Sequence, residues 1–229
     1  MKTIGLLGGM SWESTELYYR LINEETKRLR GGLHSAPIVM VSVDFHEIER
    51  LQARDDWDTS ARILSKHARR IESAGAELLL ICTNTMHKVA DQVAAAIGIP
   101  LLHIADATAR HVTASGVRTA GLLGTRFTME QPFYRDRLLQ SGLTVLVPDE
   151  EDRALVHRII YEELCLGRVN PASRQAFLRI IETLRESGAE AVIEGCTEIG
   201  LLVGQEHTDV QLFDTTRIHA SQAVAEALG

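Results

Sequence analysis

An internal repeat is the feature that most constrains how this chain can fold. Residues 2–9 read KTIGLLGG and residues 118–125 read RTAGLLGT, with Thr, Gly, Leu, Leu and Gly in register. Later in each half, GAELLLICTNT at 75–85 is echoed by GAEAVIEGCTE at 188–198. Each run is apolar and then ends in glycine or polar residues, which is typical of a buried strand that leads into a turn. The sequence therefore predicts a duplicated unit.

The alternation of segments predicts the fold class. Aliphatic runs alternate with longer amphipathic segments, a pattern typical of a parallel sheet with crossover helices. Two more apolar runs recur in order, 38–43 with 144–147 and 104–106 with 212–214. We expect an α/β fold of two similar domains related by a pseudo-twofold duplication, each a mostly parallel four-stranded sheet flanked by helices. Helices are expected at about 12–30, 58–74, 86–97, 106–115, 128–141, 152–166, 171–187 and 215–228.

Two segments are plausible crossing points between the domains. Few periodic signals pass through Pro100 or through the polar stretch 205–209. The expected first domain is 1–99 plus 208–229, and the expected second domain is 100–207. Because ligands of open α/β sheets bind at the carboxyl ends of the strands, the active site is expected in the cleft between the two domains.

Composition excludes several classes of function. The formal charge is −7 and basic residues are scattered, which argues against a nucleic-acid partner. No apolar run is long enough for a membrane span, and the N-terminal apolar stretch is too short for a signal peptide. Three cysteines and nine histidines show no disulfide framework and no metal-ligand spacing. We therefore expect a cytoplasmic protein with no metal.

The glycine-rich turn at residues 5–9 has two interpretations. It lacks the GxGxxG spacing of a dinucleotide site, and no acidic residue clearly ends a second strand at the distance expected for a residue that holds a ribose. A tight turn at Gly8, Gly9, Met10 and Ser11 that faces a small anionic ligand accounts for it better. The alternative is that these glycines serve only close helix packing.

Cys196 lies where the apolar run 191–193 gives way to Gly195 and the polar residues Thr197 and Glu198. Such a position, at the start of a helix, is expected to lower the pKa of a thiol and favour the reactive thiolate. The alternative is a buried, inert cysteine. Cys165, within a helical run, is expected in the core.

A second polar turn carries Thr83, Asn84 and Thr85 at the end of the repeated strand. Hydroxyl and amide groups in such a turn suit a carboxylate ligand, although the same residue types also cap helices without any ligand. Thr125, at the end of the repeated first strand, has the same two interpretations.

The polar turns carry a resemblance to a known family. TNTMH at 83–87 resembles the Cys-Asn-Thr-x-His motif of the aspartate/glutamate racemase superfamily, and GCTE at 195–198 resembles its second motif. With GGMS at 8–11, the similarity extends along essentially the whole chain. The resemblance implies a racemase of a small-molecule amino acid that needs neither pyridoxal phosphate nor metal. It also implies that the last strand and helix of each half are exchanged between the domains, and that the chain forms a homodimer, as family members commonly do.

One residue departs from the family pattern, because Thr83 stands where the family has its first cysteine and Cys82 precedes it. The repeat can be aligned with either residue opposite Cys196. Adjacent strand residues point to opposite faces, so both cannot serve. The Asn84 and Thr85 that follow favour Thr83, and Cys82 is then expected in the core.

The resemblance implies a role for each candidate. Cys196 would remove the α-proton of the L-enantiomer, and Thr83 would pass a proton to the opposite face to give the D-enantiomer. Asn84, Thr85 and Thr197 would hold the α-carboxylate. Pocket residues are expected to be Met10, Gln52, Thr125 and Glu198.

The sequence says less about which side chain the amino-acid substrate carries. Gln52 is placed in the pocket by family position, its alternative being a solvated loop residue, and Arg50 and Arg54 would supply a cation. Aspartate and glutamate are therefore the leading substrates. The alternatives are a broad-specificity amino-acid racemase, an arylmalonate-type decarboxylase and a ligand-binding protein without activity.

Overall fold

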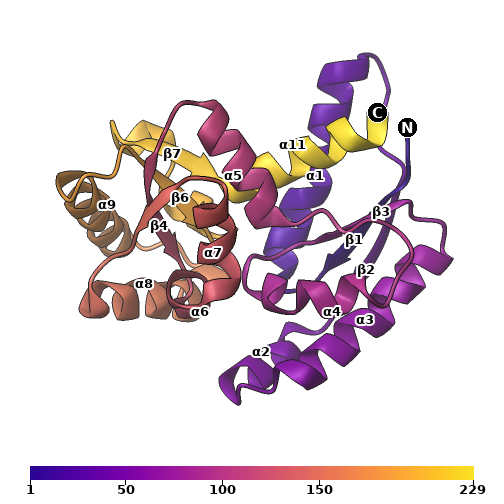
Figure 1. Cartoon of the computed structure of the whole chain (residues 1–229), viewed down its shortest axis with the longest axis horizontal. Coiled ribbons are helices and arrows are strands. Elements are labelled where there is room, and N and C mark those ends of the chain that lie inside the picture. The colour runs from indigo at the N-terminus through magenta and orange to yellow at the C-terminus, as the bar shows by residue number, and fades with distance from the viewer. The chain divides into compact units, whose positions relative to one another are not determined.

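A computed structural model describes residues 1–229 as two compact units (Figure 1). The first unit comprises Met1–Ile104 and His219–Gly229, and the second comprises Ala105–Ile218. Each unit holds a parallel sheet flanked by helices, so the predicted α/β class with two similar domains is confirmed. No helix in either unit is long and apolar enough to cross a membrane.

The sheet of the first unit has the order β2-β1-β3, with every pair parallel. Its strands are β2 (Ile38–Ser42), β1 (Ile4–Gly8) and β3 (Leu78–Ile81). A fourth position is represented only by an isolated parallel bridge between Leu79 and Leu101. This sheet therefore has three strands and a bridge where four strands were expected.

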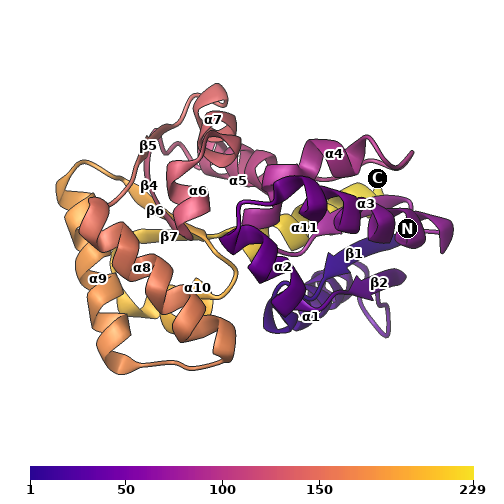
Figure 2. The same cartoon turned by 90° about the horizontal axis from the view of Figure 1, so that it is seen from below.

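Helices cover both faces of this sheet, and β1 lies between α1 and α3 (Figure 2). On one face of the sheet, α1 and α11 pack in one core cluster with β1 and β3. The buried side chains of α1 recur at helical spacing, such as Tyr18, Leu21 and Ile22. The helices of the unit are α1 (Trp12–Arg30), α2 (Phe45–Ala53), α3 (Trp57–Ser73), the 3-10 helix η1 (Thr85–Val89), α4 (Ala90–Ala94) and the greater part of α11 (Thr215–Leu228).

A buried histidine anchors α11 to the first unit at the residue where the chain re-enters it. His219 Nε2 lies 2.9 Å from the carbonyl oxygen of Leu102, and its Nδ1 lies 2.8 Å from the hydroxyl of Tyr18. Because a carbonyl only accepts, Nε2 carries the proton and Nδ1 accepts from Tyr18. Burial lowers the pKa of His219 to about 3, so the ring is neutral at physiological pH.

The second unit contains a complete four-stranded parallel sheet with the order β5-β4-β6-β7. Helices α8 and α9 pack beside each other on the sheet (Figure 2), and their apolar residues form one core cluster with β4 and β6. The strands are β4 (Thr119–Gly124), β5 (Thr144–Leu146), β6 (Ala191–Gly195) and β7 (Gln211–Asp214). The helices are α5 (Ile104–Ala114), α6 (Arg126–Glu130), α7 (Pro132–Gln140), α8 (Glu150–Glu162), η2 (Leu164–Leu166), α9 (Pro171–Glu186), α10 (Ile199–Leu202) and η3 (Gln205–His207).

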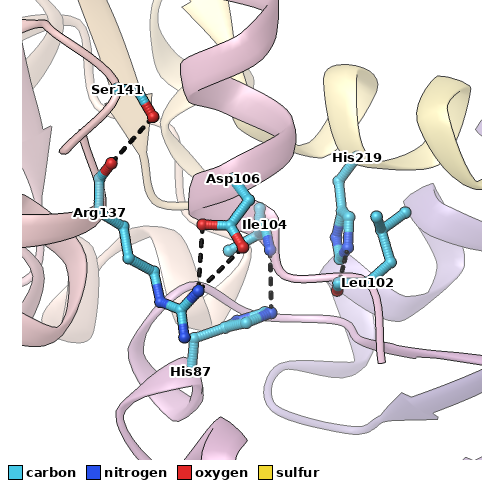
Figure 3. A network of polar contacts seen from close by, with 7 residues as sticks. All are labelled: His87, Leu102, Ile104, Asp106, Arg137, Ser141 and His219. Atoms are coloured by element: carbon cyan, nitrogen blue, oxygen red, sulfur yellow. Dashed lines mark hydrogen bonds and ion pairs between the residues drawn. The ribbon is translucent and has the colours of Figure 1, made fainter. Parts of the chain in front are cut away.

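The chain changes units later than the sequence suggested. Residues 104–106, expected as a strand, begin helix α5 instead, and Asp106 on that helix accepts hydrogen bonds from Arg137 of α7 (Figure 3). Strand β7 pairs with β6, so it belongs to the second unit, where the first had been expected. The crossings therefore follow Ile104 and Ile218. The last helix of each half, α5 and α11, lies in the other unit as expected. The expected exchange of the last strands is wrong, because β7 and the bridge at Leu101 stay with the sheets of their own halves.

The repeat has the same structural role in both units. The backbone N–H of Thr3 donates to Glu77 Oε2 at 2.8 Å, and the N–H of Glu77 donates to the carbonyl of Thr3. In the second unit the N–H of Thr119 donates to Glu190 Oε2 at 2.8 Å, and the N–H of Glu190 donates to the carbonyl of Thr119. Each glutamate thus bonds to the backbone at the start of the neighbouring central strand, which explains why the glutamate of the repeated Gly-Ala-Glu occurs twice.

One buried carboxyl makes stability depend on pH. Glu194 in β6 is 4% exposed, its Oε1 has no hydrogen-bond partner, and it lies opposite Asp214 of β7. Burial, and then the charge of Asp214, raises the pKa of Glu194 from 4.5 to about 8. Between these two pH values the folded protein binds more protons than the unfolded chain. The free energy of unfolding therefore falls as pH rises through this window.

Glu194→Gln is expected to remove most of this dependence, because the amide is neutral at every pH. At pH 8.5 the variant should be more stable than the parent by on the order of 2–4 kcal/mol, since each unit of pKa corresponds to about 1.4 kcal/mol. Urea unfolding between pH 4.5 and 8.5 measures the effect. Glu186→Gln, at an exposed position of α9, is the control. Equal pH slopes for Glu194→Gln and the parent would contradict the prediction.

Candidate active site

The sheet registers decide which residue of the first unit is equivalent to Cys196. Equivalent residues of the repeat, Ile4 and Ala120, pair with Leu78 of β3 and Ala191 of β6 respectively. Five positions later in each case, the chain reaches Thr83 and Cys196. The register therefore matches Thr83 with Cys196 and Cys82 with Gly195.

Cys82 occupies the core of the first unit. Its side chain is fully buried in the cluster that joins β1 and β3 to α1 and α11. Burial raises the pKa of this thiol far above its usual range. Thr83, the next residue, is 9% exposed. The N–H of Cys82 still donates to the carbonyl of Leu7, so the strand pairing extends one residue past β3, and by the alternation of strand side chains we expect Thr83 to lie on the opposite face from Cys82.

The polar turn after β3 holds Thr83, Asn84 and Thr85 close to the start of η1. Asn84 stands at the N-cap position of this 3-10 helix, yet its side chain makes no capping hydrogen bond. Asn84 and Thr85 are 2% and 5% exposed. Helix capping therefore does not account for the polar side chain at position 84. The buried His87 contacts the backbone of this turn, since its Nδ1 lies within hydrogen-bonding distance, 2.8 Å, of the carbonyl oxygen of Thr83.

The turn after β1 is tight for reasons of packing. Gly9 has φ +88°, and a Cβ there would lie 2.2 Å from the carbonyl oxygen of Val43. Its N–H donates to Thr15 Oγ1 at 2.7 Å, and Ser11 caps α1 by accepting from Ser14 N–H. Close packing therefore explains why position 9 is a glycine. Met10, the next residue, is buried at 3% exposure.

Gln52 lies on α2, a helix that the sequence did not predict. It is 4% exposed, and its Nε2 lies 2.9 Å from the sulfur of Met86 in η1, the 3-10 helix that follows the turn at Thr83. The interpretation of Gln52 as a solvated loop residue is therefore wrong. Arg50 and Arg54, the two neighbouring cations, are exposed.

Three consecutive polar residues follow β6 in the second unit. The Cys196 thiol donates to Glu198 Oε2 at 3.0 Å, and the Thr197 hydroxyl donates to the same oxygen at 2.6 Å. All three side chains are more than nine-tenths buried. A thiol, a hydroxyl and one carboxylate oxygen thus form a compact hydrogen-bonded group directly before α10.

The expected lowering of the Cys196 pKa is wrong. Burial, and then the charge of Glu198, raises the pKa of this thiol well above its ordinary value. Helix α10 has only four residues, so it supplies little of the dipole that would favour a thiolate. Cys196 is therefore a protonated thiol in contact with a proton acceptor.

Thr125 follows β4 and caps helix α6. Its Oγ1 accepts from the N–H of Thr128 at 3.4 Å, so Thr125 makes the helix-capping contact that was one of its two interpretations. His157 Nδ1 accepts from the N–H of Arg126 at 3.2 Å, so two of the first donors of α6, the N–H groups of Arg126 and Thr128, have acceptors.

Two contacts were missed by the sequence analysis. His87 was part of the motif but received no role, although its spacing of four from Thr83 is a helical spacing that allows such a contact. Glu198 was expected only to line the pocket, although its spacing of two from Cys196 places a carboxylate within reach of the thiol.

The fold and the equivalent turns define a duplicated α/β protein with a hydroxyl in one unit and a thiol in the other. The family profile of the Asp/Glu/hydantoin racemases matches residues 7–223. The chain belongs to this family, and it is thus an isomerase of the amino-acid racemase class.

Individual relatives cover the whole chain. A crystal structure of a proposed Asp/Glu racemase from Yersinia pestis is 57% identical over 100% of both chains, with a TM-score of 0.92. An aspartate racemase homologue from Pyrococcus horikoshii OT3 is 37% identical over 100% of both chains, with a TM-score of 0.85. The broad specificity amino-acid racemase RacX of Bacillus subtilis (strain 168) is 22% identical over 98% of each chain.

Proposed function

We propose that this protein racemises an acidic amino acid, aspartate or glutamate, without a cofactor. Cys196 acts on one face of the α-carbon and Thr83 on the other. The observation that carries the proposal is the equivalence of Thr83 and Cys196 in the two sheet registers. A racemase needs one proton acceptor and one proton donor, and equivalent turns of a duplicated fold can supply this pair.

The first step is removal of the α-proton of the L-enantiomer. Glu198 takes the thiol proton through the 3.0 Å hydrogen bond, and the thiolate of Cys196 then takes the proton from the α-carbon. The electron pair of the C–H bond remains on the substrate as an enolate-like carbanion. The negative charge moves from Glu198 to the sulfur and then to the substrate, so that Cys196 and Glu198 are both neutral once the carbanion has formed.

The second step forms a new C–H bond on the opposite face. Thr83 passes a proton to the carbanion, either its own or one relayed from water, and the hydroxyl regains its proton from water. The hydroxide that this leaves takes the proton held by Glu198, which restores the starting state of the site. A threonine hydroxyl is a weak base when unassisted, so the two faces of the reaction are chemically unequal. For the D-enantiomer the same steps run in reverse.

The substrate itself favours ionisation of the thiol. In the free protein, burial and the charge of Glu198 disfavour the thiolate of Cys196. The α-ammonium group of an amino acid carries a positive charge, and a cation near sulfur favours the thiolate. We therefore expect efficient catalysis only for substrates that keep this ammonium group.

The remaining polar side chains are assigned to binding. Asn84, Thr85 and Thr197 hold the α-carboxylate, where their dipoles also stabilise the enolate-like charge. Gln52 is placed in the pocket because it contacts Met86, next to this turn. Met10, Thr125 and Glu198 complete the proposed pocket. The three free thiols fit the reducing conditions of a cytoplasm.

Broad specificity is the second candidate, and two observations favour it. Gln52, the buried side chain beside the turn, is neutral, and the neighbouring Arg50 and Arg54 are exposed. The relative from Bacillus subtilis is a broad specificity racemase. Under this alternative, the enzyme would accept neutral side chains as readily as acidic ones.

One experiment tests the proposal and separates its alternatives. The protein is incubated with a panel of L- and D-amino acids in deuterated water without added cofactor, and NMR and chiral chromatography follow exchange and inversion. We expect deuterium at the α-carbon together with inversion, fastest for aspartate or glutamate. Similar rates across neutral amino acids would indicate the broad-specificity alternative. Absence of exchange and inversion for every amino acid would refute the proposal, and decarboxylation of an arylmalonate would then point to the other chemistry.

A further inference from the structure

His87 makes a hydrogen bond with each of two different parts of the first unit. On one side, its Nδ1 lies 2.8 Å from the carbonyl oxygen of Thr83, in the turn that carries the proposed proton donor. On the other side, its Nε2 lies 3.2 Å from the backbone nitrogen of Ile104, and Figure 3 shows this contact. Ile104 is the first residue of α5 and the last of the first unit before the chain leaves it.

The two contacts determine which nitrogen of His87 carries the proton. The N–H of Ile104 can only donate, so Nε2 accepts and carries no proton. The carbonyl of Thr83 can only accept, so Nδ1 carries the proton and donates. Protonation of Nε2 would place two N–H groups against each other. The ring is therefore neutral and of one tautomer in this arrangement.

Burial makes both contacts matter. His87 is 2% exposed, and its ring lies beside those of His103 and His219, with centroids 4.5 and 5.8 Å away. A buried imidazole with unmatched nitrogens is costly, and so is a buried backbone N–H without an acceptor. The imidazole therefore has little conformational freedom. Its hydrogen bond to the Thr83 carbonyl restricts the orientation of the Thr83 peptide.

We propose that His87 is a positioning residue for Thr83, and that its two nitrogens have separate tasks. The Nδ1–H holds the Thr83 carbonyl, and thereby the direction of the Thr83 hydroxyl. Nε2 holds the N–H at which α5 begins, and thereby the stability of this connection. The inference rests on the proposed function of Thr83.

Amide side chains can replace one nitrogen at a time. In His87→Asn the amide reaches about as far as Nδ1, so it can donate to the Thr83 carbonyl but not accept from Ile104. In His87→Gln the amide reaches about as far as Nε2, so it can accept from Ile104 but not hold Thr83. His87→Ala removes both hydrogen bonds.

The test measures inversion, exchange of the L-substrate α-proton with deuterated water, and urea unfolding for each variant. For His87→Gln we expect inversion to fall at least tenfold in kcat with KM within about threefold, while exchange by Cys196 and stability stay close to the parent. For His87→Asn we expect inversion within about threefold of the parent and a lower free energy of unfolding. For His87→Ala both losses are expected together.

Other results overturn the inference. If inversion and exchange fall in the same proportion in His87→Gln, or if His87→Asn is as poor as His87→Ala in inversion, the histidine is only structural. Thr83→Ala is measured alongside and separates this failure from failure of the proposed function. If Thr83→Ala inverts its substrate at the parent rate, the role of Thr83 itself is wrong.

Discussion

Cys196→Ala is expected to abolish both inversion and α-proton exchange. In the proposed mechanism the thiol, which is hydrogen-bonded to Glu198, is the group that takes the proton from the L-enantiomer. The loss should reach the detection limit, since the uncatalysed removal of an amino-acid α-proton is extremely slow. The measurement is the rate of deuterium incorporation and of inversion for aspartate and glutamate.

In the same assay, a substitution of Thr83 should affect inversion and exchange differently. Thr83→Ala should reduce inversion by at least a hundredfold, because the face opposite Cys196 loses its proton donor. Exchange of the L-substrate proton should persist, since Cys196 can remove and return a proton on its own face. In the D-enantiomer, exchange should be lost together with inversion. Thr83→Cys should restore a pair of thiols and raise the rate of D-to-L conversion most.

The thermodynamics of enantiomers constrains how these rates are read. Free enantiomers have an equilibrium constant of one, so kcat/KM must be equal in the two directions for every variant. A difference between the directions can therefore appear only in kcat and KM separately. A measured difference in kcat/KM would indicate an error in the assay rather than a property of the site.

Cys82→Ala is the control for the adjacent pair. Its side chain packs in the core, so the variant should lose about 1–2 kcal/mol of stability but keep its activity at temperatures where it is folded. If Cys82→Ala loses inversion while Thr83→Ala keeps it, the equivalence of Thr83 with Cys196 is not a functional one.

The duplicated fold could be predicted from the sequence because its signals are local and occur twice. The run that ends at Gly8 and the run that ends at Gly124 both became central strands, and helices α1, α3 and α9 lie within a residue or two of their expected limits. Apolar periodicity and the flanking turns determine such elements. The pairing of Thr83 with Cys196 was ambiguous because adjacent residues differ only in the face they occupy, and the sheet register supplied what the repeat alone lacked.

Other features depend on contacts between distant residues, which no local pattern records. The segment at Ile104 was short and apolar like a strand, yet it begins a helix whose Asp106 contacts Arg137. The sequence left a solvated loop open as the alternative for Gln52, because the burial of α2 depends on its neighbours in space. The raised pKa of Cys196 depends on burial and on the orientation of Glu198, and neither can be read from a cysteine at the end of a strand.

Glu198→Gln is expected to have opposite effects on the ionisation of the thiol and on turnover. The charge of Glu198 raises the pKa of Cys196, so the neutral amide should lower that pKa and speed alkylation of Cys196 by iodoacetamide at a given pH. Turnover should nevertheless fall by about 10²- to 10⁴-fold, because an amide keeps the shape of the side chain but cannot take the thiol proton. Peptide mass spectrometry of the alkylated protein and the exchange assay measure the two effects.

Glu194→Gln is the matched control for this prediction, because Glu194 is a buried glutamate two residues before Cys196 with no hydrogen bond to its sulfur. With a pKa of about 8 its carboxyl is mostly neutral at pH 7, so the amide should leave turnover at that pH within about threefold of the parent. A role for Glu198 in charge balance alone predicts that Glu198→Gln speeds both alkylation and turnover. A role in binding alone predicts a higher KM with kcat and alkylation unchanged. Only a carboxylate that takes the thiol proton during turnover predicts faster alkylation together with a lower kcat.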